Sequence, residues 1–369
     1  MTITSFAFKG HKSSVNCLEY QKNGDSSLLL SGSDDKTARV WDIRTSKTAL
    51  CIQALSAVTS ASFGDPSTKG ERGGLFSQNA SVFLAMEDTT IFEYDLRRAE
   101  TPILMQPTHD LTDSFQLTEE VNQISFSKGR ISSADDGGAV RIWDGAKLRV
   151  LQSERSSPFL MTCCSFRSGD QLASGGTDCN IYLWDIGRPH KPLDTISITR
   201  DDTGANQVCN PPMVQTLAWS PSRRLLATGL GDGTISITTV VKKKLIELAR
   251  LRNGHSDSVA SLCFPKFGSP NSNDRLLASA GTDGLIFFWE LNGTMAGKSS
   301  QEPSRVLSPE LLRKEVEDIE FTSKEEYDLL FGIPHQAKAN WIVSALSDTI
   351  FVADVTSEIT GYRIPLKNS

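Results

Sequence analysis

One short sequence pattern recurs along most of the chain. It is plainest at residues 10–43, where Gly-His precedes an apolar run VNCLEY, then LLLSGSDD and KTARVWDI. The pattern returns at 124–144, 164–186, 217–240 and 262–291 and, in a weaker form, at 82–96. Such self-similarity constrains the fold more than any local propensity, because each repeat is one supersecondary unit that its neighbours must complete.

The distance between equivalent residues sets the period. The aromatic position of the pattern falls at residues 41, 94, 143, 184, 238 and 289, which lie 53, 49, 41, 54 and 51 residues apart. Tyr94 and Thr238 replace the usual Trp. A period of roughly 40–45 residues plus loop insertions is typical of WD-type repeats. An Asp precedes this position by six residues in five units, whereas Asp136 precedes Trp143 by seven, which predicts one extra residue in the third unit.

Each unit predicts three strands, and the apolar stretch after it predicts a fourth. A lone four-stranded sheet cannot bury both of its faces, so the units are expected to stack radially. The sequence therefore predicts an all-β fold over residues 1–369, a seven-bladed WD40 β-propeller. Its blades are expected at 10–55, 56–105, 118–153, 159–198, 213–250, 255–335 and 338–366.

The last blade is predicted without a Gly-His or a WD dipeptide. Residues 340–346, 350–355 and 358–364 have the pattern of three consecutive strands. The N-terminal stretch ITSFAF (3–8) alternates apolar residues and is expected to add the outer strand of this blade. That closure joins the two ends of the ring and removes the open edges that invite aggregation.

The longest interruption of the repeats spans residues 292–328 and is polar and acidic. Ser308 and Pro309 form a helix-start signal, and Leu312, Val316 and Ile319 follow at helical spacing. One short amphipathic helix is predicted, which packs locally or stays mobile, or else binds a partner. Residues 328–335 are expected to resume as the outer strand of the sixth blade.

Composition excludes several classes of function. The net charge of −6 disfavours general binding of nucleic acid, which requires a basic face. No stretch approaches 18 apolar residues, so no membrane span is expected. The seven cysteines form no CxxC pair and predict buried or idle thiols in a reducing compartment. We expect an intracellular protein, in the nucleus, the cytoplasm or both, that is monomeric by itself.

Four polar residue types recur with the repeat, and together they have the donors and acceptors for one buried network. The complete sets are His11, Ser31, Asp35 and Trp41, and His255, Ser279, Asp283 and Trp289. Ser132, Asp136 and Trp143, and Ser174, Asp178 and Trp184, are expected to keep the set without the His. A hydrolase triad needs only one copy, so repetition favours a structural role. No catalytic residue, metal site or cofactor is predicted, and His109, His190 and His335 have no predicted partner.

Two arginines mark the first two blades. Arg44 and Arg97 each stand three residues beyond the aromatic position, in WDIR and YDLR, and no other blade repeats this. The third strands end on one face of the disc, so both arginines are predicted on one rim, as guanidinium forks suited to carboxylates or carbonyls. The alternative is that each only caps a turn or pairs with its own Asp42 or Asp95.

The run LLSGSDDKTARVWDIR (29–44) resembles the repeat motif of WD-repeat proteins that serve cullin-4 ubiquitin ligases as substrate receptors. The stretches 131–144, 338–346 and 349–366 resemble one group of WD-repeat proteins whose last blade also lacks the signature. The resemblance implies docking on the DNA-damage-binding adaptor of the ligase through Arg44 and Arg97, supported by Asp42 and Asp95. Tyr94 in place of Trp departs from the motif.

Two functions are carried forward from these observations. The first is a scaffold that docks on the ligase adaptor and holds an unknown substrate protein. The second is a scaffold, or a peptide or histone-tail reader, in another multiprotein complex, with the central opening as its binding site. Fold alone does not separate them, since propellers host many functions.

Overall fold

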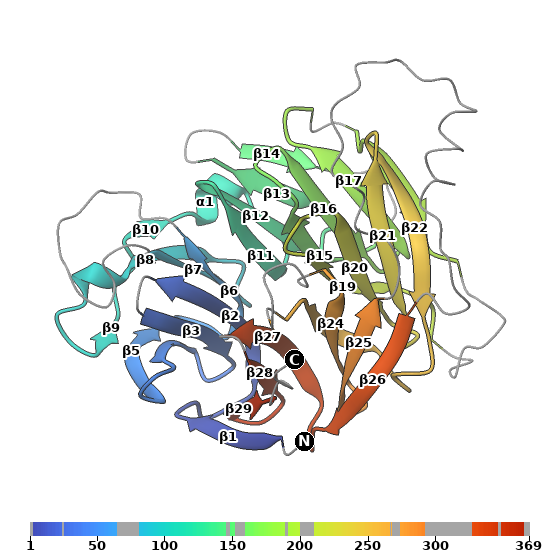
Figure 1. The fold of residues 1–369 in the computed structure, drawn as a ribbon. Helices are drawn as coiled ribbons and strands as arrows, with labels where there is room; N and C mark the ends of the chain where they lie inside the picture. The colour runs from blue at the N-terminus through green and yellow to red at the C-terminus, as the bar shows by residue number, and fades with distance from the viewer. Residues whose placement is uncertain are drawn as a thin grey trace, which may run out of the picture.

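The computed structural model describes residues 3–23, 26–64, 81–144, 148–151, 159–188, 191–199, 210–265, 267, 274–291, 327–345 and 348–364. Within these ranges, seven sheets stand side by side around a ring, and they are antiparallel except for the short pair of β5 with β9 (Figure 1). The predicted all-β, seven-bladed propeller is confirmed. The blades are numbered here by the order of their innermost strands along the chain, and the four strands of each repeat are a, b, c and d from the centre outwards.

The first four blades account for the N-terminal half of the ring. Blade one contains β2 (Val15–Asn23), β3 (Ser26–Ser33), β4 (Thr37–Asp42), β5 (Lys47–Gln53) and β9 (Ile103–Leu104). Blade two contains β6 (Val58–Gly64), β7 (Ser81–Met86), β8 (Ile91–Asp95) and β10 (His109–Asp110). Blade three contains β11 (Val121–Ser127), β12 (Arg130–Asp135), β13 (Val140–Trp143) and β14 (Leu148–Leu151). Blade four contains β15 (Met161–Phe166), β16 (Gln171–Gly176), β17 (Asn180–Asp185) and β18 (Asp194–Ser197).

The remaining three blades complete the ring. Blade five contains β19 (Val214–Trp219), β20 (Leu225–Leu230), β21 (Ile235–Val241) and β22 (Lys244–Leu251). Blade six contains β23 (Val259–Cys263), β24 (Leu276–Gly281), β25 (Leu285–Leu291) and β26 (Tyr327–Pro334). Blade seven contains β27 (Ala339–Ala345), β28 (Thr349–Asp354), β29 (Glu358–Arg363) and β1 (Thr4–Lys9). Two short helices, η1 (Leu96–Arg98) and α1 (Thr112–Phe115), follow strand c of blade two.

The ring closes where the two ends of the chain meet. Strand β1 pairs antiparallel with β29 in a continuous register from Thr4 opposite Arg363 to Lys9 opposite Glu358 (Figure 1). The prediction that residues 3–8 complete the last blade is therefore confirmed. Phe8 carries the packing at this junction, because its ring is buried against Trp41 and Phe351.

Blade two differs from its predicted range of 56–105 at its outer edge. Residues Ile103–Leu104, expected in blade two, pair in parallel with β5 and extend blade one. The outer strand of blade two is instead His109–Asp110, which pairs with β8. The chain thus crosses from blade two to the edge of blade one and back.

Burial on both faces explains the composition of the middle strands. Leu28, Leu29 and Leu30 of β3 are all buried, although their side chains alternate between the two faces of the blade. Every blade is covered by a neighbour on either side, so a continuous apolar run replaces the alternation of a half-exposed strand. The core is therefore divided among the interfaces between blades.

The turn between strands b and c needs a left-handed residue at one fixed position. Lys36 has a φ of 63°, and Gly138, Gly233 and Gly284 occupy the same place in later blades with φ between 75° and 82°. Glycine adopts this conformation without steric cost. The Asp-Lys and Asp-Gly turn signals in the sequence thus correspond to a real backbone requirement.

A β-bulge after the first residue of strand a occurs in every blade, and it links neighbouring blades. In five blades the bulge residue turns its side chain to the next blade, where it donates to the carbonyl of the first residue of that strand a. Asn16 donates to Val58 at 3.0 Å and Asn122 to Met161 at 2.9 Å. The same contact joins Thr59 to Val121, Thr162 to Val214 and Asn340 to Val15. In blade six the bulge residue is Ala260, whose side chain has no donor.

Several predictions lie outside the described residues. They concern the helix from Ser308 to Ile319 within the 292–328 insertion, and His190. The strand expected at 328–335 is confirmed as β26. Six cysteines lie in the described ranges, and each is a free thiol. No helix in these ranges has the length and apolarity that crossing a membrane requires.

Candidate docking face and the blade networks

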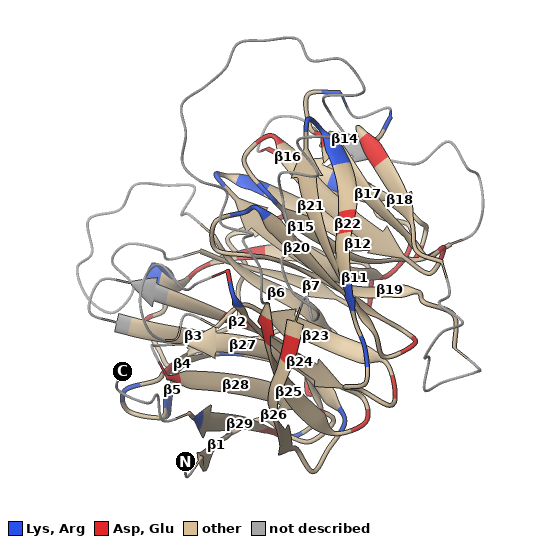
Figure 2. Cartoon of the chain, turned by 45° about the vertical axis from the view of Figure 1, so that its right-hand side comes forward, with Lys and Arg blue, Asp and Glu red and all other residues tan. Residues whose placement is uncertain are grey.

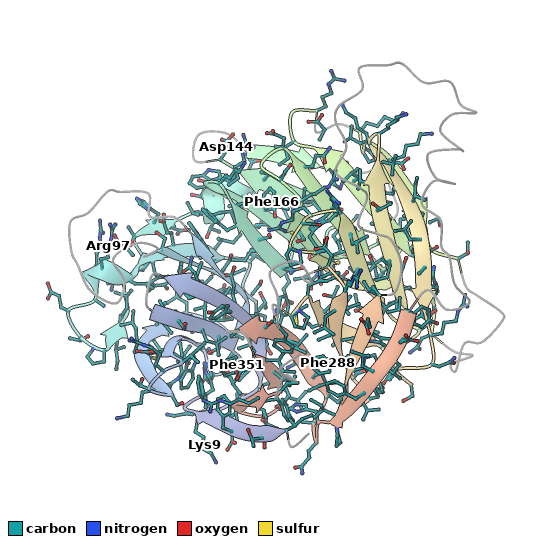
Figure 3. All side chains as sticks on the ribbon, in the orientation of Figure 1. Lys9, Arg97, Asp144, Phe166, Phe288 and Phe351 are labelled. Atoms are coloured by element: carbon teal, nitrogen blue, oxygen red, sulfur yellow. The ribbon has the colours of Figure 1, made fainter. Side chains whose placement is uncertain are left out.

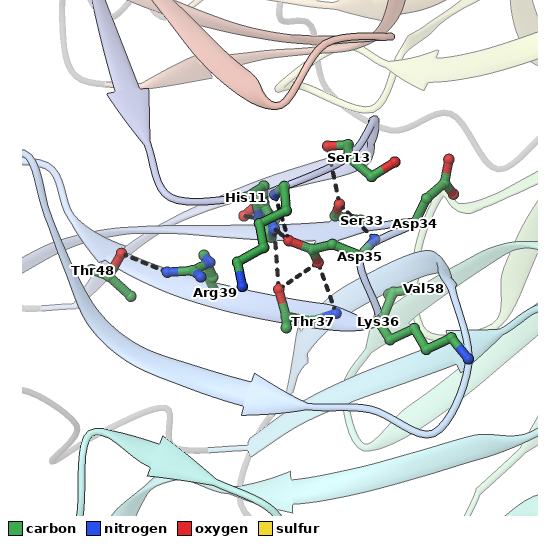
Figure 4. Close-up of polar contacts among 12 residues, drawn as sticks. His11, Ser13, Ser33, Asp34, Asp35, Lys36, Thr37, Arg39, Thr48 and Val58 are labelled. Atoms are coloured by element: carbon green, nitrogen blue, oxygen red, sulfur yellow. Dashed lines mark hydrogen bonds and ion pairs between the residues drawn. The ribbon is translucent and has the colours of Figure 1, made fainter.

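The four recurring polar residues of blade one form one chain of hydrogen bonds. Figure 4 shows the part of this network around His11, Asp35 and Thr37. Trp41 Nε1 donates to Ser31 Oγ at 2.9 Å, and Ser31 Oγ lies 2.7 Å from His11 Nε2. His11 Nδ1 lies 3.0 Å from Asp35 Oδ2. Since the indole can only donate, the serine hydroxyl donates to His11 Nε2, and Nδ1–H donates to the carboxylate.

Blade six repeats this chain atom for atom. Trp289 donates to Ser279 at 2.9 Å, Ser279 lies 2.8 Å from His255 Nε2, and His255 Nδ1 lies 3.1 Å from Asp283. Blade four keeps the bond from Trp184 to Ser174, and there Tyr182 and Asn180 donate to Asp178. Recurrence at one register in separate blades indicates that these residues fix the strands and the loop of their own blade.

Blade three was misaligned by the sequence reasoning. Trp143 pairs with Ile131 as Trp41 pairs with Leu29, so Ser133 and Gly137 occupy the places of Ser31 and Asp35. The roles expected for Ser132 and Asp136, and the predicted extra residue, were therefore wrong. Asp135 and Asp136 of this blade stand one residue earlier than Asp34 and Asp35 do in blade one, because Gly137 takes the position of Asp35.

Blade seven contains a network that the sequence reasoning missed. His335 precedes strand a by four residues, as His11 does in blade one. Its Nδ1 lies 2.9 Å from Tyr362 Oη and its Nε2 lies 2.9 Å from Asp354 Oδ2. Tyr362 stands at the register position of Trp41. Its phenolic hydroxyl reaches His335 directly, so no serine is needed between the two side chains. The signal was available in the spacing, but no Gly precedes this His.

One buried and one partly buried carboxylate were also missed. Glu93 accepts hydrogen bonds from Ser81 at 2.7 Å and from His109 Nδ1 at 2.8 Å, so His109 has a partner. Glu19 lies between blades one and two, where Oε2 accepts from the backbone N–H of Phe63. Burial raises the pKa of Glu19 to about 7, against the opposing effect of hydrogen bonds from Phe63 and Ser62.

The network aspartates have the opposite shift. Burial acts to raise the pKa of Asp35, but hydrogen bonds from His11, Thr37 and the backbone of Lys12 outweigh it and hold the pKa below its usual range. The same balance, with His255 and His335 as donors, lowers the pKa of Asp283 and Asp354. The native state therefore favours the charged form of all three carboxylates.

These shifts predict a maximum of stability in mildly acidic solution. The lowered Asp pKa values contribute stability above about pH 4 that is lost as the pH falls further. The raised pKa of Glu19 contributes stability at low pH that is lost between 4.5 and about 7, where the unfolded carboxyl deprotonates first. Thermal melts across this range are expected to peak between the two limbs.

Two substitutions test which carboxylates cause the loss of thermal stability at low pH and towards neutral pH. Asp283→Asn should flatten the acid limb, and Glu19→Gln should flatten the fall towards neutral pH. Asp170→Asn is the control, because its side chain is 89% exposed. A profile that Asp283→Asn and Glu19→Gln leave as steep as in the wild type would contradict the assignment.

The two predicted arginines occupy equivalent places on neighbouring blades. Arg44 follows β4 and Arg97 follows β8, each three residues beyond the aromatic position of strand c. Arg44 Nε and Nη2 donate to both oxygens of Asp42 at 3.1 and 3.0 Å. Arg97 does the same with Asp95 at 2.9 and 2.7 Å. Each Asp also accepts from the backbone N–H of its arginine, so the turn-capping interaction considered from the sequence is present.

The two ion pairs differ in how much of the arginine side chain is exposed to solvent. The side chain of Arg44 is 56% exposed, whereas that of Arg97 is 9% exposed. Figure 3 shows Arg97 near the outer edge of the ring, away from Phe288 and Phe351. The side-chain hydrogen bond that Arg44 donates to Asp42 is the main cause that lowers the pKa of this carboxyl, and burial opposes it. Arg44 is thus the member of the pair that another protein can reach in this conformation.

Comparison with known proteins agrees with this architecture. The family model "WD domain, G-beta repeat" matches residues 3–42, 145–185, 208–238 and 247–290. These ranges include the c strands of blades one and four and most of those of blades five and six, whereas the c strands of blades two, three and seven fall outside them. In blades two, three and seven, Tyr94, Gly137 and Tyr362 replace residues of the recurring network. Thr238 replaces the Trp of blade five in the same way, although the family model matches that blade.

Two relatives and two solved structures are similar along most of the chain. A WD repeat-containing protein 53 homolog of Dictyostelium discoideum is 25% identical over 95% of this chain and 91% of its own length. The ribosome biogenesis protein WDR12 homolog of Nematostella vectensis is 26% identical over 76% of this chain and 55% of its own length. The WD40 propeller domain of Doa1 superposes with a TM-score of 0.65 at 16% identity, covering 98% of this chain and 96% of that one. The propeller domain of Cps50 (Swd1) from Myceliophteria thermophila gives 0.68 at 14%, covering 98% and 100%.

The two structures are similar in fold alone, and the sequence relatives extend the likeness to the repeats themselves. Four stretches match the repeat model, strands a to c have the same register in all seven sheets, and the ring is closed by the N-terminal strand. The chain carries WD40 repeats and folds as a seven-bladed WD40 β-propeller.

Proposed function

We propose that this propeller is a protein-interaction scaffold that docks on the DNA-damage-binding adaptor of a cullin-4 ubiquitin ligase and presents a substrate protein to it. One observation carries the proposal. Arg44 and Arg97 stand at equivalent positions on neighbouring blades, and each guanidinium is held by the carboxylate two residues before it. The resemblance of residues 29–44 to the receptor motif supports the same function.

The geometry assigns different roles to the two arginines. A bidentate Asp–Arg pair fixes the guanidinium plane before binding, which lowers the entropy cost of docking. Arg44 exposes more than half of its side chain and is expected to contact the adaptor directly. Arg97, nearly buried, is expected to hold the turn after β8 in position.

Quantitative binding of the purified adaptor tests this division. Arg44→Ala should weaken binding by about tenfold or more, the usual effect of removing an arginine at the centre of an interface. Arg97→Ala should weaken it further in the double variant. Arg98→Ala is the control, since this neighbouring arginine is exposed on the same helix, η1.

Two results would count against the docking proposal. The first is an adaptor that does not bind the wild-type protein at all. The second is binding that Arg44→Ala and Arg98→Ala change equally. Thermal melts of each variant separate a lost contact from a lost fold.

A second candidate, a reader of basic peptides such as histone tails, has one observation in its favour. Glu120 lies near Asp136 and Glu87 on the face opposite Arg44, and burial followed by these two charges raises its pKa. A basic peptide would relieve that repulsion. Peptide-array binding that is lost in Glu120→Gln, with adaptor binding absent, would favour this function over ligase docking.

A further inference from the structure

The loops that join strands a to b and c to d lie on one face of the disc. Hydrogen bonds between them show this within single blades: Ile43 N donates to Ser27 O, Ile186 N to Asp170 O and Leu291 N to Arg275 O. The face therefore includes the turns of Arg44 and Arg97. It also includes the corresponding loops of blades three to five, on another part of the ring.

Those loops are strongly basic in a protein that is acidic as a whole. Their described parts are 127–130, 143–144, 166–171, 185–188, 191–194, 219–225 and 241–244, and they hold ten Lys and Arg residues and four Asp residues. Figure 2 shows blue segments gathered in the upper half of the molecule, near the β15 and β16 labels. We call six of the residues the basic arc: Lys128, Arg130, Arg167, Arg188, Arg223 and Arg224.

Three arginines of the basic arc are held in place by main-chain carbonyls of a neighbouring blade. Arg130 of blade three donates to Gly169 O of blade four. Arg167 of blade four donates to Arg223 O of blade five at 3.1 Å, and Arg223 donates back to Phe166 O at 3.1 Å. The loops are thus linked across three blades, which orders the cations before any partner binds.

The charges of the arc are poorly compensated. Among the described residues, Arg130 pairs with the exposed Asp170, while Arg167, Arg188, Arg223 and Arg224 form no ion pair. Burial lowers the pKa of Arg167 and of Arg223, and no carboxylate opposes that effect. A carbonyl oxygen uses one of the N–H groups of a guanidinium and leaves others to bind an anion.

The opposite face of the same blades has the opposite sign. Its described loops, 116–120, 136–139, 159–160, 177–179, 198–199, 210–213 and 231–234, contain five acidic residues and no Lys or Arg. The disc is therefore electrically polar through its thickness at blades three to five. Such a separation of charge steers an approaching anion to one face.

We propose that the basic arc is a second docking surface, one that binds an acidic peptide segment of a partner protein. A long polyanion such as nucleic acid would extend beyond the arc over a molecule of net charge −6 and be repelled. A short acidic segment gains the attraction of the arc without that repulsion. The surface is separate from Arg44 and Arg97 and does not depend on the ligase proposal.

Fluorescence anisotropy of the full chain with a labelled peptide of alternating Glu and Ser residues tests the proposal. The double variant Arg188→Glu/Arg224→Glu should weaken binding by about tenfold or more, since these side chains are exposed and form no side-chain hydrogen bond or ion pair within the described part of the chain. Lys12→Glu/Lys338→Glu changes the net charge equally on the opposite face and should change binding less than about twofold. Raising the salt from about 50 to about 200 mM should weaken wild-type binding severalfold.

Three outcomes would overturn the proposal. One is binding of the Glu/Ser peptide no tighter than that of the matching Gln/Ser peptide. Another is equal weakening by the two double variants, which would mean general electrostatics. The third is tight binding of a single-stranded oligonucleotide or of phosphatidylserine vesicles while the acidic peptide fails, which would assign the arc to a different class of partner.

Discussion

Replacing Phe8 by Ala is expected to lower the free energy of unfolding by about 3–5 kcal/mol, the usual effect of removing a fully buried aromatic ring. Phe8 is 1% exposed, and its ring centroid lies 5.4 Å from Trp41 and 5.3 Å from Phe351. It therefore packs blade seven against blade one through the strand that closes the ring. Loss of this ring should destabilise the closure and the whole fold together.

Urea denaturation followed by tryptophan fluorescence measures the effect. Lys9→Ala is the matched control on the same strand, because Lys9 forms only an exposed pair with Glu358 at 2.8 Å. That variant should change stability by less than about 1 kcal/mol. If both variants unfold at the same urea concentration, β1 does not contribute to closure as described.

The substitution Trp289→Thr should be comparably severe, with a loss of about 3–5 kcal/mol. It copies the residue that blade five has naturally at this position, Thr238. In blade six the indole is buried, and its Nε1–H donates to Ser279. The smaller side chain would leave a cavity and remove the donor from the chain that holds His255 and Asp283.

Blade five supplies the control for that experiment. The hydroxyls of Thr228 and Thr238 are buried there, and neither has a hydrogen-bond partner among the described residues. Thr238→Val removes one unsatisfied hydroxyl at nearly constant volume and should leave stability unchanged or raise it by about 1 kcal/mol. A Thr238→Val variant that unfolds as readily as Trp289→Thr would show that blade five has a network of its own.

The fold was predictable because repetition supplies the same evidence several times. Even the degenerate units show this: Tyr94 and Thr238 occupy the register position of Trp41, as their spacing predicted. Blade seven was found from its strand pattern and from the need to close the ring, not from its polar residues.

What the sequence could not supply was the register of side chains that lack the signature. Asp136 looked like the partner of Trp143, and only the strand pairing shows that Gly137 takes that place. His335 looked isolated because its partners, Asp354 and Tyr362, meet it from strands b and c of a blade with no WD dipeptide. The pairing of Ile103–Leu104 with blade one depends on a loop path that no local pattern specifies.

The basic arc was visible as separate residues in the sequence, yet it becomes a surface only in the ring. Arg130, Arg167 and Arg223 stand 37 and 56 residues apart along the chain and belong to three different blades. The carbonyl contacts that join them arise from blade stacking. Net charge predicted an acidic protein correctly and still gave no information about how the charge is divided between the two faces.

The side chains at the β-bulges join neighbouring blades, and each donates in the same direction around the ring. From Asn340 around to Val214, each blade is tied to the next by a donor that crosses the junction. Ala260 cannot continue the series, and the junction of blades six and seven has an apolar core together with a hydrogen bond between Cys263 and the backbone of Ser344. The series of bulge donors is therefore interrupted at blade six, although Ser222 and Asp274 still join blades five and six through two hydrogen bonds. We expect any widening of the central opening at the junction of blades six and seven, while blades one and two keep the spacing of their arginines.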